Sequence, residues 1–401
     1  MEYKIANRMS TIQGSIIREI FKSANDPEMI SLAGGNPAPE TFPSEELADI
    51  AYDILKNNPV LSLQYSVTEG YEPLKKKVRQ MLKDSEGIDA PQDQVMILSG
   101  AQQCMDLCSK ILINPGDTII VEEPSFIGSL NAFRSFEPNM VGVPMDEDGM
   151  RMDALRKAIE ENNNVKFIYT IPTFQNPSGI TMSLERRKEL YEIALENQIL
   201  IIEDNPYAEL TFDGSKLPTL KSMDIADIVI YAGSFSKILS PGMRLGFTLA
   251  PAEIVAKMTI AKQMSDVHTG ILNQLMADGF IERYDIYEYI ARARKIYGKK
   301  CAHMLKCMEK YFPPEVKYTH PTGGLFIWAT MPSGYNSMKV SDICAAAKVA
   351  FVPGNAFAVD MNKPSPSFRL NYSSMDYDKI EEGIRILGET LTEIMNVKSK
   401  A

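Results

Sequence analysis

The sequence predicts an α/β protein in which a large domain with a mostly parallel, seven-stranded sheet is joined to a smaller α+β domain. The chief observation is that short apolar runs alternate with amphipathic helical segments from residue 95 onward, which is typical of a parallel sheet covered on both faces. Beyond residue 316, strands and helices continue without that regularity. A chain of 401 residues is also long enough for a large core and a second lobe.

The N-terminal segment is predicted to be mainly helical. Residues 11–24 have the pattern of a short amphipathic helix with Ser10 as its N-cap, and further helices are expected at 44–57 and around 72–82. Before these, a brief strand leads into Gly-Gly-Asn-Pro at 34–37, where small residues let the backbone approach a ligand closely. A plain connecting turn is the alternative interpretation of this loop.

Seven apolar runs are candidates for the strands of the large sheet. They occupy residues 95–98, 118–121, 140–143, 165–170, 199–203, 228–231 and 245–249. Helices are predicted between most of them, including 101–113, 152–161 and 184–197. The link between the last two strands is too short for a helical crossover, so we expect an antiparallel strand at the edge of the sheet. Ligands of such sheets bind at the carboxyl ends of the strands.

The remaining chain is predicted to form a helical connection followed by the small domain. Residues 251–311 have the pattern of one long helical stretch with a kink near Gly270 or Gly279. Strands are then expected near 325–329 and 368–372, and helices near 340–347 and 375–395. We expect three parts: an N-terminal arm that contributes to the small domain (1–60), the large domain (61–290) and the C-terminal small domain (291–401).

Composition and charge exclude several classes of function. The net charge of −10 argues against a general surface for nucleic acid or anionic membranes, and no apolar run has the length of a membrane span. The first eight residues lack the apolar core of a signal peptide. The five cysteines include no Cys-x-x-Cys pair, and Cys104 and Cys108 are expected to be small core residues. We therefore expect a cytoplasmic protein with reduced thiols.

A metal site is not expected from the histidines. His268, His303 and His320 are scattered along the chain without the spacing of metal ligands. Neither a Gly-x-Gly-x-x-Gly fingerprint nor a P-loop motif is present, so the sequence offers no signal for dinucleotides or for nucleoside triphosphates.

One lysine stands out as a candidate for covalent chemistry. Lys237 lies among small hydroxyl residues just after an apolar strand, and Arg244 follows seven positions later. Shielding from water and a second nearby cation both lower the pKa of a lysine, which makes it a candidate to form a Schiff base. A solvated lysine on a surface turn is the alternative interpretation of this segment alone.

The residues that follow the other strands decide between these interpretations. Ser99-Gly100-Ala101-Gln102 opens a helix whose N-terminus can hold a phosphate, and Phe126 can stack on a flat ligand or belong to the core. Asn176 offers an amide in a tight turn, and Asp204 ends an apolar strand close to Tyr207. A buried Asp is costly without a partner. One ligand uses the whole set: a phosphorylated pyridine aldehyde, with Asp204 on its ring nitrogen and Lys237 on its aldehyde.

The sequence resembles the fold-type I aminotransferases of class I/II, which depend on pyridoxal 5'-phosphate (PLP). Matching motifs extend from 31–35 (Ser-Leu-Ala-Gly-Gly) to 367–369 (Ser-Phe-Arg), nearly the whole chain. Three blocks are highly specific in their order: Asn-Pro-Ser-Gly at 176–179, Glu-Asp-Asn-Pro-Tyr at 203–207 and Ser-Phe-Ser-Lys at 234–237. The 2-aminoadipate/kynurenine branch, which includes the aminotransferase-like half of GntR/MocR-type regulators, is the most similar.

The resemblance implies a role for each matching residue. Lys237 and Asp204 would be catalytic, Lys237 carrying the cofactor and Asp204 pairing with its ring nitrogen. Cofactor contacts are implied for Gly100, Ala101, Gln102, Phe126, Asn176, Asp204, Tyr207, Ser234, Ser236, Lys237 and Arg244, with Tyr65 reaching the cofactor of a neighbouring subunit. Gly35, Asn176 and Arg369 would bind substrate, Arg369 through the α-carboxylate. Tyr65 thereby implies a homodimer with shared active sites.

The implied function is transfer of an amino group between an L-amino acid and a 2-oxo acid. We expect 2-aminoadipate, aromatic or branched-chain donors, with Leu32, Phe126 and Tyr207 near the substrate. Other PLP chemistry, such as C–S lyase or decarboxylase activity, and a non-catalytic effector-sensing domain are the alternatives. The chain departs from the family at two positions: Phe126 stands where tyrosine is frequent, and Ala101 where many relatives have a hydroxyl residue, so one phosphate contact is expected to be missing.

Overall fold

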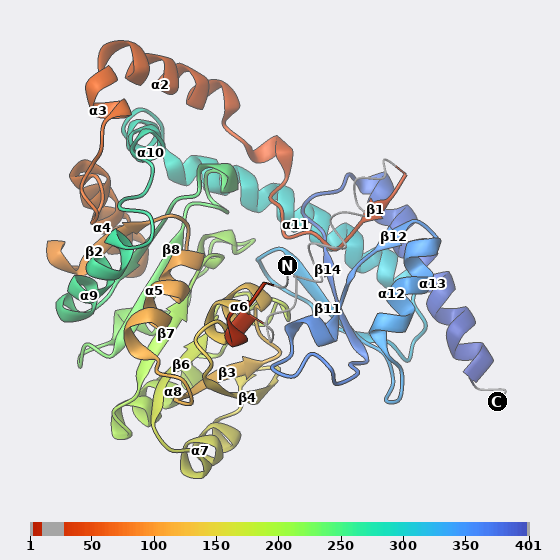
Figure 1. Cartoon of the computed structure of the whole chain (residues 1–401). Coiled ribbons are helices and arrows are strands. Elements are labelled where there is room, and N and C mark those ends of the chain that lie inside the picture. The colour runs from red at the N-terminus through yellow and green to blue at the C-terminus, as the bar shows by residue number, and fades with distance from the viewer. Residues whose placement is uncertain (1–2, 10–27, 399–401) are drawn as a thin grey trace.

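The computed structural model describes residues 3–9 and 28–398 of the chain. The helix predicted at 11–24 lies outside the described residues. Figure 1 shows a large sheet with its helices on one side of the molecule and a smaller sheet, with α12 and α13, on the other. Within the described part, no helix combines the length and the apolar character that crossing a membrane requires.

The seven predicted strands form the large sheet together with a short eighth strand. The strands are β2 (Val95–Leu98), β3 (Thr118–Glu123), β4 (Asn139–Asp146), β5 (Gly149–Met150), β6 (Val165–Thr170), β7 (Leu200–Asp204), β8 (Val229–Ser234) and β9 (Gly246–Leu249). Their order across the sheet is β2-β9-β8-β7-β6-β3-β4-β5. The pairs from β4 through β3, β6 and β7 to β8 are parallel.

Strand β9 is antiparallel to β8, as the short link predicts, but the prediction that it lies at the edge is wrong; the antiparallel strand at an edge is the short β5, which pairs with β4. Strand β9 pairs antiparallel with β8 on one side and with β2 on the other. The short link after β8 returns the chain alongside that strand, and the fully buried β2 then occupies the outer position. Sequence spacing indicates the direction of β9 correctly, whereas its neighbour comes from a segment more than a hundred residues earlier.

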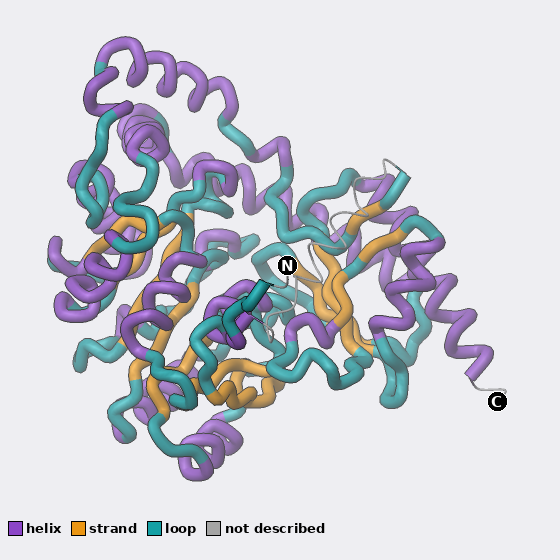
Figure 2. Tube along the Cα trace, viewed as in Figure 1, coloured by secondary structure: helices purple, strands orange, loops and turns teal. Residues whose placement is uncertain are grey.

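Helices cover both faces of the large sheet, as Figure 2 shows. Along β3, Ile119 and Val121 pack on the face covered by α5 (Gln102–Leu112), and Ile120 packs on the opposite face. That second face is covered by α7 (Met152–Glu161) and α8 (Leu184–Glu196), while α6 (Ile127–Arg134), which the sequence did not predict, packs beside α5. Cys104 and Cys108 of α5 are buried, as expected of core residues, and all five cysteines are free.

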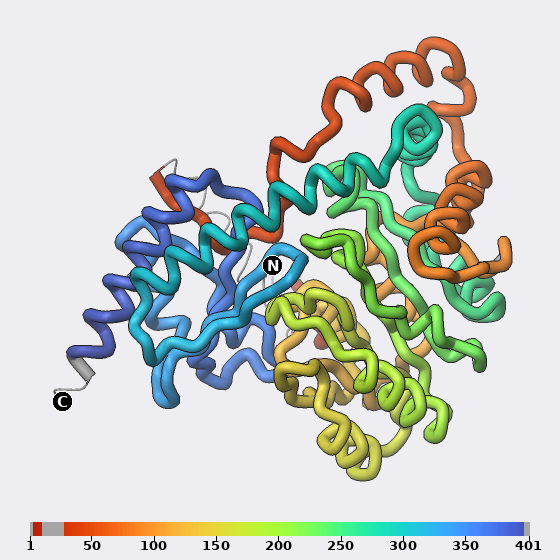
Figure 3. Tube along the Cα trace, turned by 180° about the vertical axis from the view of Figure 1, so that it is seen from behind, coloured from red at the N-terminus to blue at the C-terminus, as the bar shows by residue number. Residues whose placement is uncertain are grey.

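The prediction of one helical stretch over 251–311 is wrong, because the chain forms three helices there. These are α9 (Ala252–Gln263), α10 (Ile271–Arg283) and α11 (Ile286–Tyr311). Gly270 is the N-cap of α10, so it separates helices rather than kinking one, and Gly279 lies inside α10 close to Ile50. The Asp285 side chain accepts two backbone hydrogen bonds at the start of α11. Figure 3 shows α11 running along the back of the molecule between the two sheets.

The small sheet is antiparallel and lies near the C-terminal end of α11. Its order is β10 (Lys317–Tyr318), β11 (Phe326–Thr330), β14 (Ser367–Asn371) and β13 (Val352–Pro353). The accompanying helices are α12 (Ser337–Ala346) and α13 (Tyr377–Lys398). The predicted strands and helices of this region are found within a few residues of their expected positions.

The N-terminal segment contacts both halves of the molecule. Strand β1 (Ile30–Ser31) pairs in parallel with β12 (Val349–Ala350), beside the small sheet. Helix α2 (Ser44–Asn57), as predicted, then packs on α10, followed by α3 (Pro59–Leu63) and α4 (Glu72–Glu86). Between β1 and α2, the chain passes over the carboxyl ends of the large-sheet strands. There the carbonyl oxygen of Gly35 accepts a hydrogen bond from Lys237.

Candidate active site

A cavity of about 380 Å³ lies at the carboxyl ends of the large-sheet strands, and residues of the small sheet close it. Most of the predicted site residues line it: Gly35, Ala101, Gln102, Phe126, Asn176, Asp204, Tyr207, Ser234, Ser236, Lys237, Arg244 and Arg369. Gly100 and Tyr65 do not. Residues as far apart in the chain as Gly35 and Arg369 are thereby brought to one place, which is the position expected for ligands of parallel sheets.

Lys237 follows β8 and points its amine into this cavity. The Nζ atom donates a hydrogen bond to the carbonyl oxygen of Gly35 at 2.7 Å. Loss of hydration lowers the pKa of Lys237 to about 8, and the positive charges of Arg369 and then Arg244 contribute in the same direction. The surface-turn alternative is therefore excluded, and the larger cationic effect comes from Arg369 rather than from the neighbouring Arg244.

Asp204 ends β7 with one carboxylate oxygen satisfied and one free. Its Oδ2 atom accepts a hydrogen bond from the Tyr169 hydroxyl at 2.8 Å, and the Ser129 hydroxyl lies 2.8 Å from that phenol oxygen. Its Oδ1 atom is buried and has no hydrogen-bond partner among the described residues. Burial raises the pKa of Asp204 to about 7, and the charge of Glu122 adds to that rise. A cationic N–H donor in the cavity would satisfy this oxygen and restore the ionised form.

Arg369, in β14, presents a buried guanidinium from the opposite side. Its terminal nitrogens donate to Asn176 Oδ1 at 2.7 Å and to the carbonyl oxygen of Ala33 at 2.8 Å, whereas Nε has no partner. The guanidinium carbon lies 4.2 Å from the ring centroid of Phe326 and 4.9 Å from that of Phe357. Burial lowers the pKa of Arg369 to about 10, so the group stays cationic at neutral pH.

The loop at 99–103 has the geometry of a phosphate site. Gly100 has φ +83°, and a Cβ there would lie 2.4 Å from an Arg244 guanidinium nitrogen, so glycine lets the cation approach the loop. At the start of α5, the N–H groups of Gln103 and Cys104 donate to the carbonyl oxygens of Gly100 and Ala101 at 3.1 and 2.9 Å. The N–H groups of Ala101 and Gln102, which line the cavity with Arg244, have no hydrogen bond within the described part of the chain and remain for a ligand. The Gln102 side-chain amide donates to the carbonyl oxygen of Gly128 at 2.7 Å.

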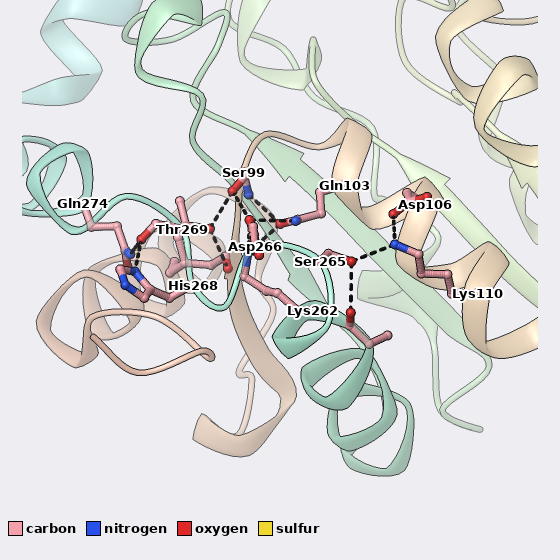
Figure 4. Close-up of polar contacts among 12 residues, drawn as sticks. Ser99, Gln103, Asp106, Lys110, Lys262, Ser265, Asp266, His268, Thr269 and Gln274 are labelled. Carbon is pink, nitrogen blue, oxygen red and sulfur yellow. Dashed lines mark hydrogen bonds and ion pairs between the residues drawn. The ribbon is translucent and has the colours of Figure 1, made fainter. Parts of the chain in front are cut away.

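A paired group of charged residues fixes this loop from behind (Figure 4). Asp266 accepts hydrogen bonds from the Ser99 hydroxyl at 2.6 Å and from the Gln103 amide at 2.9 Å. The ammonium of Lys262, whose side chain is fully buried, donates to Gln103 Oε1 at 2.6 Å and to Asp266 at 2.9 Å. The start of α5 is thus tied to the end of α9 and to the loop before α10. No sequence pattern indicated this arrangement.

The remaining lining groups surround the space between Lys237 and Asp204. The Asn176 amide nitrogen lies 3.5 Å from the Tyr207 hydroxyl, and burial raises the pKa of Tyr207. Phe126 lies against Gly128, where a Cβ would come within 2.6 Å of its ring, so the absence of a side chain there lets the ring sit over the start of α6. Ser234 Oγ accepts the Ser236 backbone N–H at 3.1 Å.

One expectation places a residue where the structure does not, whereas Tyr65 was expected at the cofactor of a neighbouring subunit and not in the cavity of its own chain. Leu32, expected near the substrate, is fully buried in the core and does not line the cavity. Tyr65 is 81% exposed and outside the cavity, with its ring 6.0 Å from that of His268. Phe326 and Ile171 provide apolar lining that the sequence did not indicate.

Tyr169 and Glu122 were also missed, although both are polar groups inside apolar strands. Glu122 is fully buried and accepts hydrogen bonds from the Ile171 backbone and the Gln175 amide, each at 3.1 Å, and so holds the loop that carries Asn176. A polar residue within an otherwise apolar buried strand was the signal available for both.

The lining residues present polar atoms that match the chemical groups of PLP one by one. The free oxygen of Asp204 matches a protonated ring nitrogen, and the amine of Lys237 matches an aldehyde. The start of α5, Arg244 and the two serines match a phosphate, and Phe126 matches the face of an aromatic ring. Arg369 remains for a second anion.

Comparison with known proteins agrees with this geometry. The profile of the family "Aminotransferase class I and II" matches residues 27–387. The aromatic-amino-acid aminotransferase 1 of Thermococcus litoralis is 39% identical, covering 96% of this chain and 93% of its own length. The 2-aminoadipate transaminase of Thermus thermophilus is also 39% identical, covering 96% of this chain and 95% of its own. Among solved structures, a kynurenine aminotransferase of Pyrococcus horikoshii in complex with PMP aligns with a TM-score of 0.93 and 39% identity over 97% of each chain.

Proposed function

Because this chain belongs to the aminotransferase class I and II family, we propose that the cavity at the carboxyl ends of the large-sheet strands is where it transfers an amino group. The chain is a PLP-dependent aminotransferase of fold type I. The proposal concerns which residues perform the reaction and on which substrates. The observation that carries it is that Lys237, the free oxygen of Asp204 and Arg369 face one cavity from three different elements.

Asp204 and its neighbours hold the cofactor ring in the state that the reaction needs. When bound, PLP supplies an aldehyde that condenses with amines and a ring that accepts the electron pair left when the substrate Cα proton departs. Asp204 Oδ1 keeps the ring nitrogen protonated, and the Tyr169 hydroxyl keeps the carboxylate oriented for this. Asn176 and Tyr207 would hold the ring hydroxyl, and Phe126 would lie against the ring, since all three line the cavity.

Lys237 moves the proton. With PLP and an amino acid bound, its neutral amine would remove the proton from the substrate Cα and hold it for return later in the transfer. Its lowered pKa of about 8 leaves a useful fraction of the amine neutral near neutral pH, which an ordinary lysine would not provide. The hydrogen bond to Gly35 fixes the amine at the cavity wall until then.

Arg369 binds the α-carboxylate of both the amino acid and the 2-oxo acid. A guanidinium offers two parallel donors, and Arg369 has one buried N–H without a partner and no ion pair among the described residues. The Phe326 ring beneath it shields the planar group from water, which strengthens the pair with a carboxylate.

The lining of the cavity favours apolar and aromatic side chains on the substrate. Its cations in the described part of the chain are Lys237, Arg244 and Arg369, and each already has a role toward the cofactor or the α-carboxylate. Phe326, Ile171 and Tyr207 supply the apolar area. We therefore place aromatic and branched-chain donors ahead of 2-aminoadipate, within the range covered by the relatives.

A homodimer completes the proposed enzyme. Tyr65 is 81% exposed, and Val60, Leu63 and Met264 are also largely exposed, at 78%, 72% and 78%. An apolar surface of this kind suits a second copy of the chain, with Tyr65 reaching the cofactor phosphate bound by that copy.

We also propose that the chain divides into an N-terminal arm, a large domain and a small domain. Its buried free thiols favour the cytoplasm.

The proposal is tested by exchange of the Cα proton of L-phenylalanine in D₂O, followed by NMR on the PLP-loaded enzyme. Lys237→Ala is expected to retain PLP but to reduce exchange by about 10²–10⁴-fold or more, because the proton acceptor is gone. Lys257→Ala, at an exposed position on α9, is the matched control and should exchange like the wild type. Exchange by Lys237→Ala at the wild-type rate would refute the assignment.

A further inference from the structure

Outside the active-site cavity, a histidine, a cysteine and a glutamate meet where α11 packs against α13. His303 and Cys307 lie four residues apart on one face of α11, and Glu381 lies on the first turns of α13. One potential ligand atom from each lies within 4.8 Å of the others. Cys307 is buried, while His303 and Glu381 are partly exposed, so the group can be reached from solvent at one side. Nothing in the amino-transfer reaction uses these residues.

The sulfur and nitrogen atoms already have the separation of two ligands on one ion. Cys307 Sγ lies 3.7 Å from His303 Nε2. A tetrahedral zinc ion with Zn–S of about 2.3 Å and Zn–N of about 2.0–2.1 Å places these two ligand atoms about 3.6 Å apart. Spacing of four residues on a helix brings the two side chains to the same face and allows this.

An oxygen donor lies close to the same histidine nitrogen. The carbonyl oxygen of Tyr377, the first residue of α13, is 3.0 Å from His303 Nε2, and the Tyr377 ring packs edge-on against the imidazole at 5.2 Å. Two ligand atoms 3.0 Å apart can share an ion at ordinary metal–nitrogen and metal–oxygen distances. The imidazole is thus held in place by the helix that also supplies the carboxylate.

Glu381 can supply the fourth donor. Its Oε1 atom accepts hydrogen bonds from the Tyr311 hydroxyl at 3.0 Å and the Lys310 ammonium at 3.2 Å, whereas its Oε2 atom has no partner among the described residues. The Lys310 side chain is 62% exposed and can swing into solvent. One of its carboxylate oxygens already lies within 4.8 Å of the ligand atoms of His303 and Cys307.

We propose that His303, Cys307 and Glu381, with the Tyr377 carbonyl, bind a divalent transition-metal ion of the zinc class. A set of one thiolate, one imidazole and two oxygens suits zinc or cobalt and is unsuited to magnesium or calcium, which prefer oxygen alone. On binding, the Cys307 thiol releases its proton to water. The His303 proton that Nε2 now donates to the Tyr377 carbonyl is also lost to water while Nδ1 takes one up, so the ring stays neutral and coordinates through Nε2. The charge of the site rises by one.

A bound ion would join α11 to α13. Helix α11 also reaches the N-terminal arm, because the Tyr297 hydroxyl accepts the backbone N–H of Ala38 at 3.1 Å. The site therefore fastens the C-terminal helix to the element that links the small sheet with the active-site segments. Metal occupancy is expected to raise the melting temperature without entering the chemistry of amino transfer.

Cobalt(II) is the probe that tests this, because tetrahedral cobalt bound to a thiolate has intense visible d–d bands and a near-ultraviolet charge-transfer band. The full-length, PLP-loaded protein, with the cofactor absorbance as baseline, is expected to take up one cobalt per chain with both features, and zinc should displace it. Cys307→Ser should abolish the charge-transfer band. His303→Ala and Glu381→Gln should weaken cobalt binding by more than the roughly tenfold typical of losing an outer-shell contact.

Cys301→Ser is the matched control, since Cys301 is equally buried on the same helix but lies against the carbonyl oxygen of Pro321. It should keep both cobalt features. Glu381→Gln changes a side chain at the surface and tests the site even where Cys307→Ser fails to fold. Absence of the charge-transfer band in the wild type, or its survival in Cys307→Ser, would overturn the proposal, as would equal loss in Cys301→Ser.

Discussion

Two groups of buried charges lie on either side of the loop at 99–103, and they differ in how completely they are paired. Behind the loop, the ammonium of Lys262 contacts Asp266 and Gln103, and both oxygens of Asp266 are engaged. In front of it, in the cavity, Asp204 and Arg369 each keep a buried polar atom without a partner.

The difference separates residues that hold the fold from residues that await a ligand. A buried charge without a counter-charge costs several kcal/mol, so a folded chain does not keep one without compensation elsewhere. The group behind the loop is compensated within the chain and acts as structure. The groups in the cavity are compensated by what binds: the ring nitrogen of PLP for Asp204, and a substrate carboxylate for Arg369.

The substitution expected to have the largest effect is Arg369→Lys, which keeps the positive charge and removes the planar pair of N–H donors. The kcat/KM for L-phenylalanine is expected to fall about 10–100-fold, equivalent to about 1.5–3 kcal/mol of charged hydrogen bonding. Reaction with 2-phenylethylamine, which has no carboxylate, should change little. Steady-state and single-turnover rates with both amines measure the ratio. A parallel fall for both would show that Arg369 supports the fold rather than the substrate.

A second test compares the two groups directly through the stability of the apoprotein in urea. Burial raises the pKa of Asp204 from 3.8 to about 7, so the folded chain holds this proton more tightly than the unfolded chain. The group's contribution to stability therefore falls as pH rises from about 4 to 7, and its full cost is present above pH 7. Asp204→Asn removes that cost and should stabilise the apoprotein at pH 8 by about 1–3 kcal/mol, and by less at pH 5.

Asp266→Asn should have the opposite sign. It breaks the pair with fully buried Lys262 and is expected to destabilise the apoprotein by about 1–3 kcal/mol at pH 8, while leaving kcat with saturating PLP nearly unchanged. Urea unfolding at pH 5 and pH 8 measures both variants. If the two substitutions destabilised the protein alike, the distinction between paired and ligand-directed charges would fail.

The smallest effect is expected at Ala101, where many relatives have a hydroxyl residue. Ala101→Ser adds a donor at the start of α5, beside Arg244, and should slow PLP dissociation about 2–10-fold, equivalent to about 0.5–1.5 kcal/mol for one hydrogen bond. Ala252→Ser, at the exposed start of α9, is the control and should not change it. Release of PLP followed by absorbance gives the rate. Faster release from Ala101→Ser would contradict the phosphate assignment for this loop.

Much of the fold and of the cavity follows from local pattern, and the failures have different causes. Apolar runs mark the strands, and polar residues directly after them mark the cavity, since parallel strands end at the same edge; Asp204 and Lys237 were found in this way. The interior position of β9 depends on a partner distant in sequence, whereas the breaks before α10 and α11 have local signals, Gly270 and the Asp285 cap, that were not recognised as helix starts. Distant partners also make the Tyr169–Asp204 contact. Lys262 and Asp266 are only four residues apart, but their contacts with Gln103 and Ser99 join segments more than 150 residues apart.

The sequence identified the right residue type for Lys237 but not the main source of its cationic environment. Spacing pointed to Arg244, seven positions away, whereas the stronger effect comes from Arg369, which the small sheet brings across the cavity. Similarly, Leu32 belongs to the core, and Phe326 takes the place expected for it at the cavity. Periodicity in the sequence cannot show which arginine acts more strongly on Lys237, or which apolar residue lines the cavity. Both depend on how the two sheets face each other.

The most direct measurement is the visible spectrum of the PLP-loaded protein on addition of L-phenylalanine without any 2-oxo acid. The account predicts that the cofactor absorbance converts fully to that of the aminated form, with one phenylpyruvate released per active site, and that an added 2-oxo acid restores the original spectrum. A cofactor absorbance that stays unchanged with aromatic, branched-chain and 2-aminoadipate donors alike would contradict it.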